Sequence, residues 1–195
     1  RQLGRFEEAL VEERQALDQE RELHGESSLE YAEVASGLAL TLHGLTRDEE
    51  AIPFAASALE VRRRLLPADH PRIADALEAL GLARMGAGEA GEAVAALEEC
   101  LVLRRRVYGA SHPAVLEALN SLASALEAGA RFEEALVVRQ EAMRLSRQVL
   151  PAGSDSLAVQ DSIRASASAR EGRAGDMAVW VDRESERAGR WVRPA

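Results

Sequence analysis

A six-residue motif occurs twice in this chain, and the distance between its two copies limits the possible folds. Arg-Phe-Glu-Glu-Ala-Leu stands at residues 5–10 and again at residues 131–136, which is 131 − 5 = 126 residues later. Glu50-Ala51 and Glu92-Ala93 divide that distance into equal steps of 42 residues. Self-similarity at a fixed period of this length indicates an array of stacked supersecondary units. We therefore expect stability to come from stacking rather than from one compact core.

The composition favours helices as the repeating elements. Hydrophobic residues make up 47% of the chain but aromatic residues only 4%, so the apolar content is mainly Ala, Leu and Val. Apolar residues recur at helical spacing in two segments of each period, which predicts one helical hairpin per repeat. The expected fold class is all-α, a solenoid of antiparallel helix pairs.

The period also predicts the organisation of the chain. Residues 1–26 form the second helix of a truncated first repeat, and residues 27–68, 69–110 and 111–152 form three complete repeats. Polar residues enter the interior registers in residues 153–195, which predicts a degenerate C-terminal capping repeat. Because residue 1 lies inside a repeat, we expect the chain to be a piece of a longer protein.

Helix starts are predicted from capping signals. Ser27 with Glu30, and Thr46 with Glu49, have capping-box spacing. Asp69 is predicted as the N-cap of the helix that Pro71 opens.

Charge and residue usage exclude several classes of function. All 24 basic residues are Arg and the net charge is −9, which argues against a nucleic-acid partner. The absence of Lys removes the Schiff-base amine and the phosphate-loop lysine. Cys100 is the single cysteine, and no apolar run is long enough to span a bilayer. We expect a cytoplasmic protein without a cofactor or a metal, and the Arg-rich, Ala-rich composition hints at a bacterial source.

Four features suggest chemistry, but a structural role explains each of them better. Residues 86–91 match G-x-G-x-x-G but follow a predicted helix, whereas a dinucleotide site requires a preceding strand. His70 and His112 precede prolines and have no further metal ligands beside them. Cys100 occupies a register that is otherwise Ala, which predicts a small core residue. The arginines at 62–64 and 104–106 end helices, where positive charge complements the helix dipole, although a phosphate site is the alternative.

The repeats resemble tetratricopeptide repeats, in particular the 42-residue type of kinesin light chains and bacterial regulatory proteins. The resemblance rests on Ala-Leu-Asn-Ser-Leu-Ala at 118–123, on residues 130–136, and on the corners Asp69-His70-Pro71 and Ser111-His112-Pro113. It implies a right-handed superhelix whose first helices line a concave groove. It also implies a non-catalytic module that binds a peptide or protein, and an asparagine, here Asn120, that hydrogen-bonds an extended peptide backbone.

Three carboxylates share one register of the first helices: Glu33, Asp75 and Glu117 are spaced by 42 residues. At 100° per residue they point away from the core stripe, together with a set of neighbours. The predicted groove residues are Glu33, Ser36, Leu40, Asp75, Glu78, Leu82, Glu117, Asn120, Ser124 and Glu127, with His43 and Met85 on the same face. We expect an acidic groove with apolar patches that binds a segment carrying Arg or Lys; a solvated helix face is the simpler alternative.

A second hypothesis for the whole chain concerns its context. Similar arrays often form the regulatory or sensor part of a larger signalling enzyme, such as an NTPase, a kinase or a protease. An appended catalytic motif elsewhere in the protein would support this alternative. No catalytic residue is expected within the 195 residues themselves.

Overall fold

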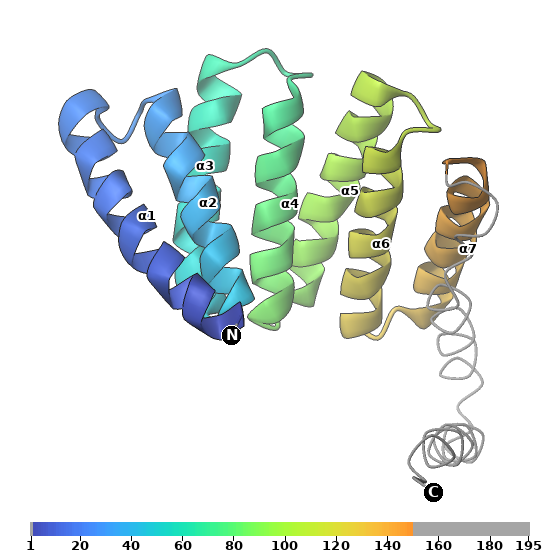
Figure 1. Ribbon diagram of the computed structural model, residues 1–195. Coiled ribbons are helices and arrows are strands. Elements are labelled where there is room, and N and C mark those ends of the chain that lie inside the picture. The colour runs from blue at the N-terminus through green and yellow to red at the C-terminus, as the bar shows by residue number, and fades with distance from the viewer. Residues whose placement is uncertain (1, 150–195) are drawn as a thin grey trace, which may run out of the picture.

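The computed structural model describes residues 2–149, and the predicted capping repeat at 153–195 lies outside the described residues. Within the described range the chain forms only helices (Figure 1). They are α1 (Gln2–His24), α2 (Leu29–Gly44), α3 (Asp48–Leu65), α4 (Pro71–Gly86), α5 (Ala90–Tyr108), α6 (Pro113–Ala128) and α7 (Phe132–Val149). None of these helices is both long and apolar enough to cross a membrane.

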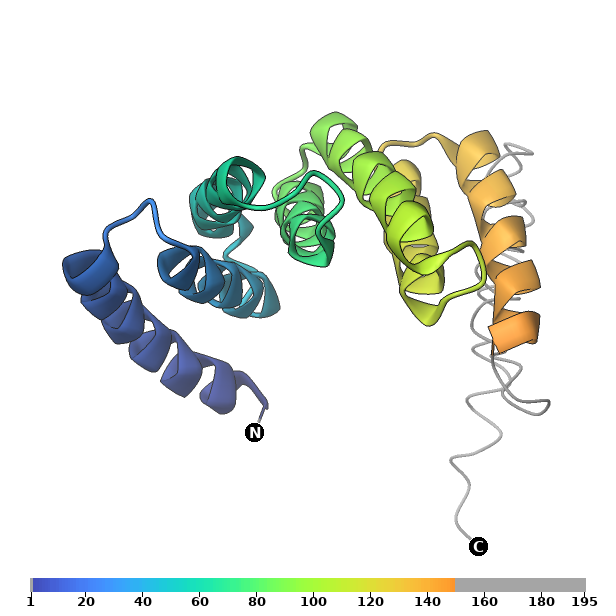
Figure 2. The same cartoon turned by 90° about the horizontal axis from the view of Figure 1, so that it is seen from above.

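Consecutive helices pack side by side in two layers. The pairs α2 with α3, α4 with α5, and α6 with α7 form hairpins, and each hairpin packs on the next. The first helices also touch one another, α2 with α4 and α4 with α6. Figure 2 shows α3 and α5 on one side of the array and α2 and α4 on the other. Because neighbours are closest in the layer of α2, α4 and α6, this layer forms the inner, concave side of the curve.

Small residues allow the helices of a hairpin to approach closely. Ala51, Ala93 and Ala135 are fully buried in one register of the second helices. Gly81 lies against Leu97, whose Cγ would be only 2.6 Å from a Cβ at position 81. Larger apolar residues fill the rest of the core. The largest fully buried side chains are Leu38, Leu42, Leu77, Leu97, Leu119, Leu126, Val115 and Cys100.

The N-caps of α2 and α4 lie one residue after the predicted positions. Ser28, not Ser27, caps α2 by accepting a hydrogen bond from the backbone N–H of Tyr31. The N-cap of α4 is His70 rather than Asp69, and its Nδ1 accepts from the N–H of Arg72 at 3.2 Å. Both corrections follow from geometry, since the capping oxygen or nitrogen must reach an unpaired N–H of the first turn.

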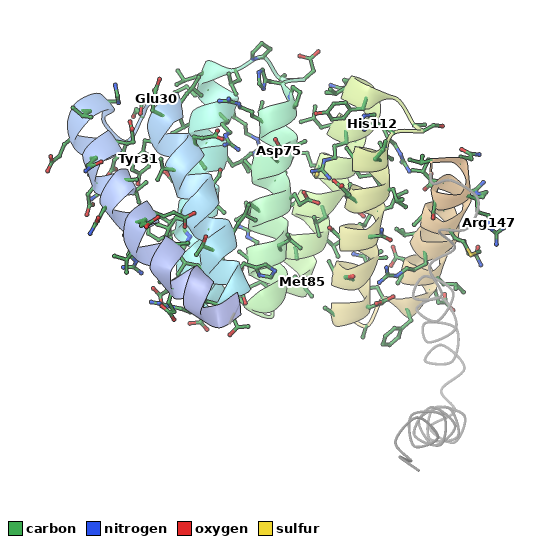
Figure 3. The ribbon with its side chains drawn as sticks, in the orientation of Figure 1. Glu30, Tyr31, Asp75, Met85, His112 and Arg147 are labelled. Carbon is green, nitrogen blue, oxygen red and sulfur yellow. The ribbon has the colours of Figure 1, made fainter. Side chains whose placement is uncertain are left out.

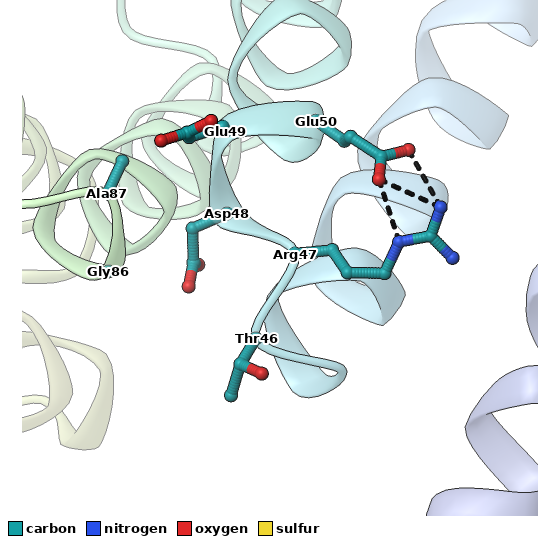
Figure 4. A pocket seen from close by; sticks show the side chains of 7 residues that line it. All are labelled: Thr46, Arg47, Asp48, Glu49, Glu50, Gly86 and Ala87. Atoms are coloured by element: carbon teal, nitrogen blue, oxygen red, sulfur yellow. Dashed lines mark hydrogen bonds and ion pairs between the residues drawn. The ribbon is translucent and has the colours of Figure 1, made fainter.

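The second predicted capping box is wrong. Thr46 adopts a left-handed backbone conformation, with φ 57°, and Arg47 takes the N-cap position of α3 without a side-chain capping bond. The Arg47 guanidinium instead binds the Glu50 carboxylate with two hydrogen bonds of 2.8 and 2.9 Å (Figure 4). Arg131 and Glu134 repeat this bidentate pair at the start of α7. The repeated Arg-x-x-Glu spacing therefore joins the turn to the first turn of the helix.

Candidate functional site

The predicted groove residues lie on the helices of the concave layer, but they differ in exposure. Figure 3 shows Asp75 on α4 of this layer. Ser36 is buried, since α2 is contacted by α1, α3 and α4, and so it offers little surface to a ligand. The exposed members are Glu33, Leu40, Asp75 and Glu117, and the partly buried members are Glu78, Leu82, Asn120, Ser124 and Glu127.

Arg62, near the end of α3, lies buried directly behind Glu33. Its guanidinium donates to Glu33 Oε2 at 3.0 Å and to the backbone carbonyl of Arg72 at 3.0 Å. Burial lowers the pKa of the Arg62 guanidinium, and the Glu33 charge opposes that shift. The Arg72 side chain adds a second, longer ion pair to Glu33 at 3.5 Å. One buried cation therefore ties a hairpin to the start of the next hairpin.

Arg104 occupies the same position one repeat later, where it faces three carboxylates. Its guanidinium donates to Glu78 at 2.7 and 3.2 Å and to the carbonyl of Ala114 at 3.0 Å. Asp75 and Glu117 approach it at 3.6 and 3.7 Å. A single guanidinium is thus shared by three acids between α4 and α6.

Together these residues form a charge ladder along one edge of the concave face, with the order Glu33, Arg62, Asp75, Arg104, Glu117. The carboxylate side chains are 60%, 59% and 67% exposed, whereas the two arginine side chains are 4% and 6% exposed. A partner would therefore meet carboxylates, with the guanidinium groups beneath them.

The pairing of Arg62 and Arg104 with the carboxylates of the ladder was not predicted from the sequence, although the spacing of these residues contains that information. Arg62 and Arg104 are 42 residues apart, and each lies 29 residues after a carboxylate of the ladder. Their neighbours have other roles: Arg63 pairs with Glu99 at 2.5 Å and Arg105 with Glu141 at 2.8 Å, both between second helices. Arg64 donates to the backbone carbonyl of Ser27 at 3.2 Å, so at least two arginines of each triplet are engaged within the protein.

The opposite edge of the concave face is held by α7. Arg139 donates to both carboxylate oxygens of Glu127 at 3.2 Å and to Ser124 Oγ at 3.2 Å. Ser124 Oγ in turn donates to the carbonyl of Asn120 at 3.1 Å. Asn120 Oδ1 is buried and has no hydrogen-bond partner within the described residues. Partly buried Leu82 and exposed Leu40 provide apolar surface on the same layer.

The pocket in Figure 4 is a structural corner between repeats. It is lined by Thr46, Arg47, Asp48, Glu49, Glu50, Gly86 and Ala87. His43, expected on the groove face, binds Asp48 with 2.5 Å between Nδ1 and Oδ1. A Cβ at Gly86 would collide with the Asp48 carboxylate, so glycine is needed for this close approach.

The remaining candidate residues have structural positions. The glycine-rich segment 86–91 covers the last residue of α4, the turn and the first residues of α5, and Gly88 in the turn has φ +84°. Cys100 is fully buried, its Sγ donates to the carbonyl of Ala74, and burial raises the pKa of its thiol to about 12. Within residues 2–149, no three His, Cys, Asp or Glu side chains gather as a metal site would require.

Comparisons with known proteins agree on one repeat family. Two family models, both described as tetratricopeptide repeat, match residues 32–72 and 72–148, together more than half of the chain. No curated protein matches the sequence.

Solved structures show the same architecture at low sequence identity. A crystal structure of nearly identical TPR-like repeats, from a protein of Podospora anserina described as a kinesin light chain, is 19% identical with a TM-score of 0.77; the match covers 98% of this chain and 92% of that one. BtubC (BKLC) from P. vanneervenii is 21% identical over 78% of this chain and 61% of its own, with a TM-score of 0.67.

A third similar structure is a Rap protein complexed with Competence and Sporulation Factor. It is 15% identical with a TM-score of 0.68, and the match covers 97% of this chain but 51% of that one. At these identities the structures establish the fold, and this chain spans about half the length of the Rap protein.

Proposed function

This chain belongs to the tetratricopeptide repeat proteins, a family of interaction scaffolds, and we propose that its concave face binds an extended protein segment carrying Arg or Lys. The binding surface comprises the exposed sides of α2, α4 and α6. No bond is made or broken in this role. The partner is held by charge, by backbone hydrogen bonds and by the apolar surface of Leu40 and Leu82.

The distribution of charge around Arg104 supports the proposal most strongly. Two arginines, Arg62 and Arg72, pair with Glu33 at one end of the charge ladder. At the other end Asp75, Glu78 and Glu117 approach the single guanidinium of Arg104. Four carboxylates therefore face three guanidinium groups along the ladder, and the one excess negative charge lies at the Arg104 end. A cationic side chain of the partner placed there relieves the repulsion between the carboxylates. Charge complementarity then makes the concave face selective for basic segments.

Selection from a random peptide library tests the proposal without knowledge of the native partner. The full chain is presented as bait, and a second bait carries Asp75→Asn and Glu117→Gln. Enrichment of Arg and Lys in peptides bound by the first bait, and its loss with the second, are the expected results. Glu60→Gln with Glu98→Gln removes two exposed charges from the outer layer and serves as the control. Selected peptides without basic enrichment, or equal loss with the control, contradict the proposal.

A regulatory role within a larger signalling protein is the second candidate. The match to about half of a Rap protein complexed with Competence and Sporulation Factor favours this reading. The size of the native protein on an immunoblot, followed by sequencing of its transcript, decides between the two. A transcript that encodes no additional catalytic domain excludes a role as part of an NTPase, kinase or protease.

We also propose that the protein works in the cytoplasm of a bacterium. A single buried Cys100 suits a reducing compartment, since the chain has no second cysteine for an internal disulfide. Detection of the native protein in the membrane or extracellular fraction of fractionated cells is the contrary result.

A further inference from the structure

The charge ladder ends one cation short of the pattern that its repeat predicts. Arg62 and Arg104 are 42 residues apart, and the next position in that register is Ser146 on α7. Ser146 lies 29 residues after Glu117, as Arg62 does after Glu33 and Arg104 after Asp75. The third repeat therefore keeps the carboxylate and replaces its arginine with a partly buried hydroxymethyl group.

Nearby arginines do not take the missing position fully. Arg104 reaches Glu117 only at 3.7 Å, because its short hydrogen bonds are made to Glu78 and to Ala114. Arg147, adjacent to Ser146, directs Nη2 to Met143 Sδ at 3.7 Å, and Figure 3 shows it on α7. Glu117 consequently remains the most exposed carboxylate of the ladder.

A second observation at the same place points to a hydrogen-bond donor from a ligand. Asn120 lies three residues after Glu117, on the same face of α6, since residues three apart are neighbours on a helix surface. Its buried Oδ1 has no partner within the described residues. A buried amide oxygen without a donor costs free energy, which a bound N–H group would recover.

We infer that Glu117, Asn120 and Ser146 form the receptor for one arginine side chain of the bound segment. The inference rests on the proposed function and specifies where the cation lies. The guanidinium pairs with Glu117 beside Ser146, at the register that Arg62 and Arg104 hold in the two preceding repeats. Rotation about χ2 of Asn120 presents Oδ1 to an N–H of the guanidinium or of the peptide backbone.

Arginine rather than lysine is expected at this position. Arg62 and Arg104 each bind a carboxylate and a backbone carbonyl at once, which a planar group with several fixed N–H donors permits. The ammonium of lysine is a point charge and matches this arrangement less well.

The test places an arginine of the chain itself at position 146. The probe is the tightest fluorescein-labelled basic peptide from the library selection, and its binding to the full chain is followed by fluorescence anisotropy. Ser146→Arg places a guanidinium opposite Glu117 and is expected to weaken binding about tenfold, the effect of losing one well-placed ion pair. Gln140→Arg adds the same charge at an exposed position of α7 and is the matched control, expected to change the affinity less than about twofold.

A second arm uses Glu117→Gln, which does not require the new arginine to be accommodated. Replacing one Arg of the peptide with Lys should weaken binding to the wild-type chain about tenfold and binding to Glu117→Gln by less than about twofold. Equal weakening by Ser146→Arg and Gln140→Arg, or the same Arg-to-Lys discrimination in both chains, overturns the inference but leaves the proposed function intact. If Glu117→Gln lowers only the stability of the full chain, an internal arginine holds the site and the inference is also wrong. Absence of basic enrichment in the selection itself refutes the proposed function instead.

Discussion

Replacement of Arg104 by Met should destabilise the array more than any other single arginine replacement on α3 or α5. The Arg104 side chain is 6% exposed and lies at the junction of α4, α5 and α6. Met keeps much of the aliphatic volume and removes the charge. The variant removes both guanidinium hydrogen bonds to Glu78, which is 22% exposed and keeps only the donor Ser121 Oγ at 3.3 Å, and it removes the guanidinium bond to the carbonyl of Ala114.

The size of the effect follows from how far each partner is buried. Breaking a fully buried ion pair costs about 3–5 kcal/mol, because one charge remains without compensation. Asp75 and Glu117 are well exposed and lose little, whereas Glu78 and the Ala114 carbonyl account for most of the loss. We expect a decrease in the free energy of unfolding of about 3 kcal/mol. For Arg62→Met, whose partner Glu33 is 60% exposed, about 1–2 kcal/mol is expected.

Urea unfolding followed by circular dichroism at 222 nm measures both values, with Arg63→Met as the control. Arg63 and its partner Glu99 are both about half exposed, so the loss there should be below about 1 kcal/mol. A double-mutant cycle of Arg104→Met with Glu78→Gln should give a coupling free energy of about 1–3 kcal/mol. If Arg104→Met and Arg63→Met unfold at the same urea concentration, the buried guanidinium of Arg104 does not couple the repeats.

Three further predictions concern the core and the caps. Gly81→Ala should lower the free energy of unfolding by about 1–3 kcal/mol, because the new Cβ would overlap the Leu97 side chain. A Cβ at Gly91 meets no atom within 4 Å, so Gly91→Ala should raise the free energy of unfolding by about 0.4–1 kcal/mol in the same urea assay. The Cys100 thiol, with its pKa raised to about 12 by burial, should resist iodoacetamide at pH 8.5 until the chain is unfolded. The thiol ionises at a lower pH in the unfolded chain than in the folded chain, so the free energy of unfolding should fall as the pH rises from about 8.5 to 12. In a Cys100→Ala chain this contribution to the pH dependence should be absent. Ser28→Ala removes the side-chain cap of α2 and should lower stability by about 1 kcal/mol, and a change below the error of the urea midpoint contradicts the assigned cap.

The period of 42 residues was sufficient to predict the fold class. The apolar stripe around Leu38, Leu80 and Leu122 repeats in phase with the small residues at Ala51 and Ala93, and both sets are buried. Helix propensity and helical spacing act locally, so one sequence contains this information. The caps were harder, because Ser27 and Ser28 are chemically equal and only the backbone geometry decides which side chain reaches Tyr31 N–H.

The partners of the arginines were not predictable from local pattern. Three consecutive arginines give no indication of which one turns inward, and a helix C-terminus attracts all of them equally. Their registers relative to Glu33 and Asp75 become informative only when the stacking of hairpins brings residues 29 positions apart into contact. Ser36 illustrates the same point, since its spacing predicts a groove residue but packing among α1, α3 and α4 buries it.

Pairing of the carboxylates changes the expected character of the groove. Three unpaired acids in one register would attract any cation over the whole concave face, with a strong dependence on salt. With Arg62 and Arg104 beneath them, long-range attraction is weak and the excess negative charge is confined to the space between α4 and α6. Selectivity must then come from short-range placement of a cation near Glu117 rather than from the net charge of −9. The Asp75→Asn and Glu117→Gln replacements should therefore alter which peptides bind more than they alter the rate of association.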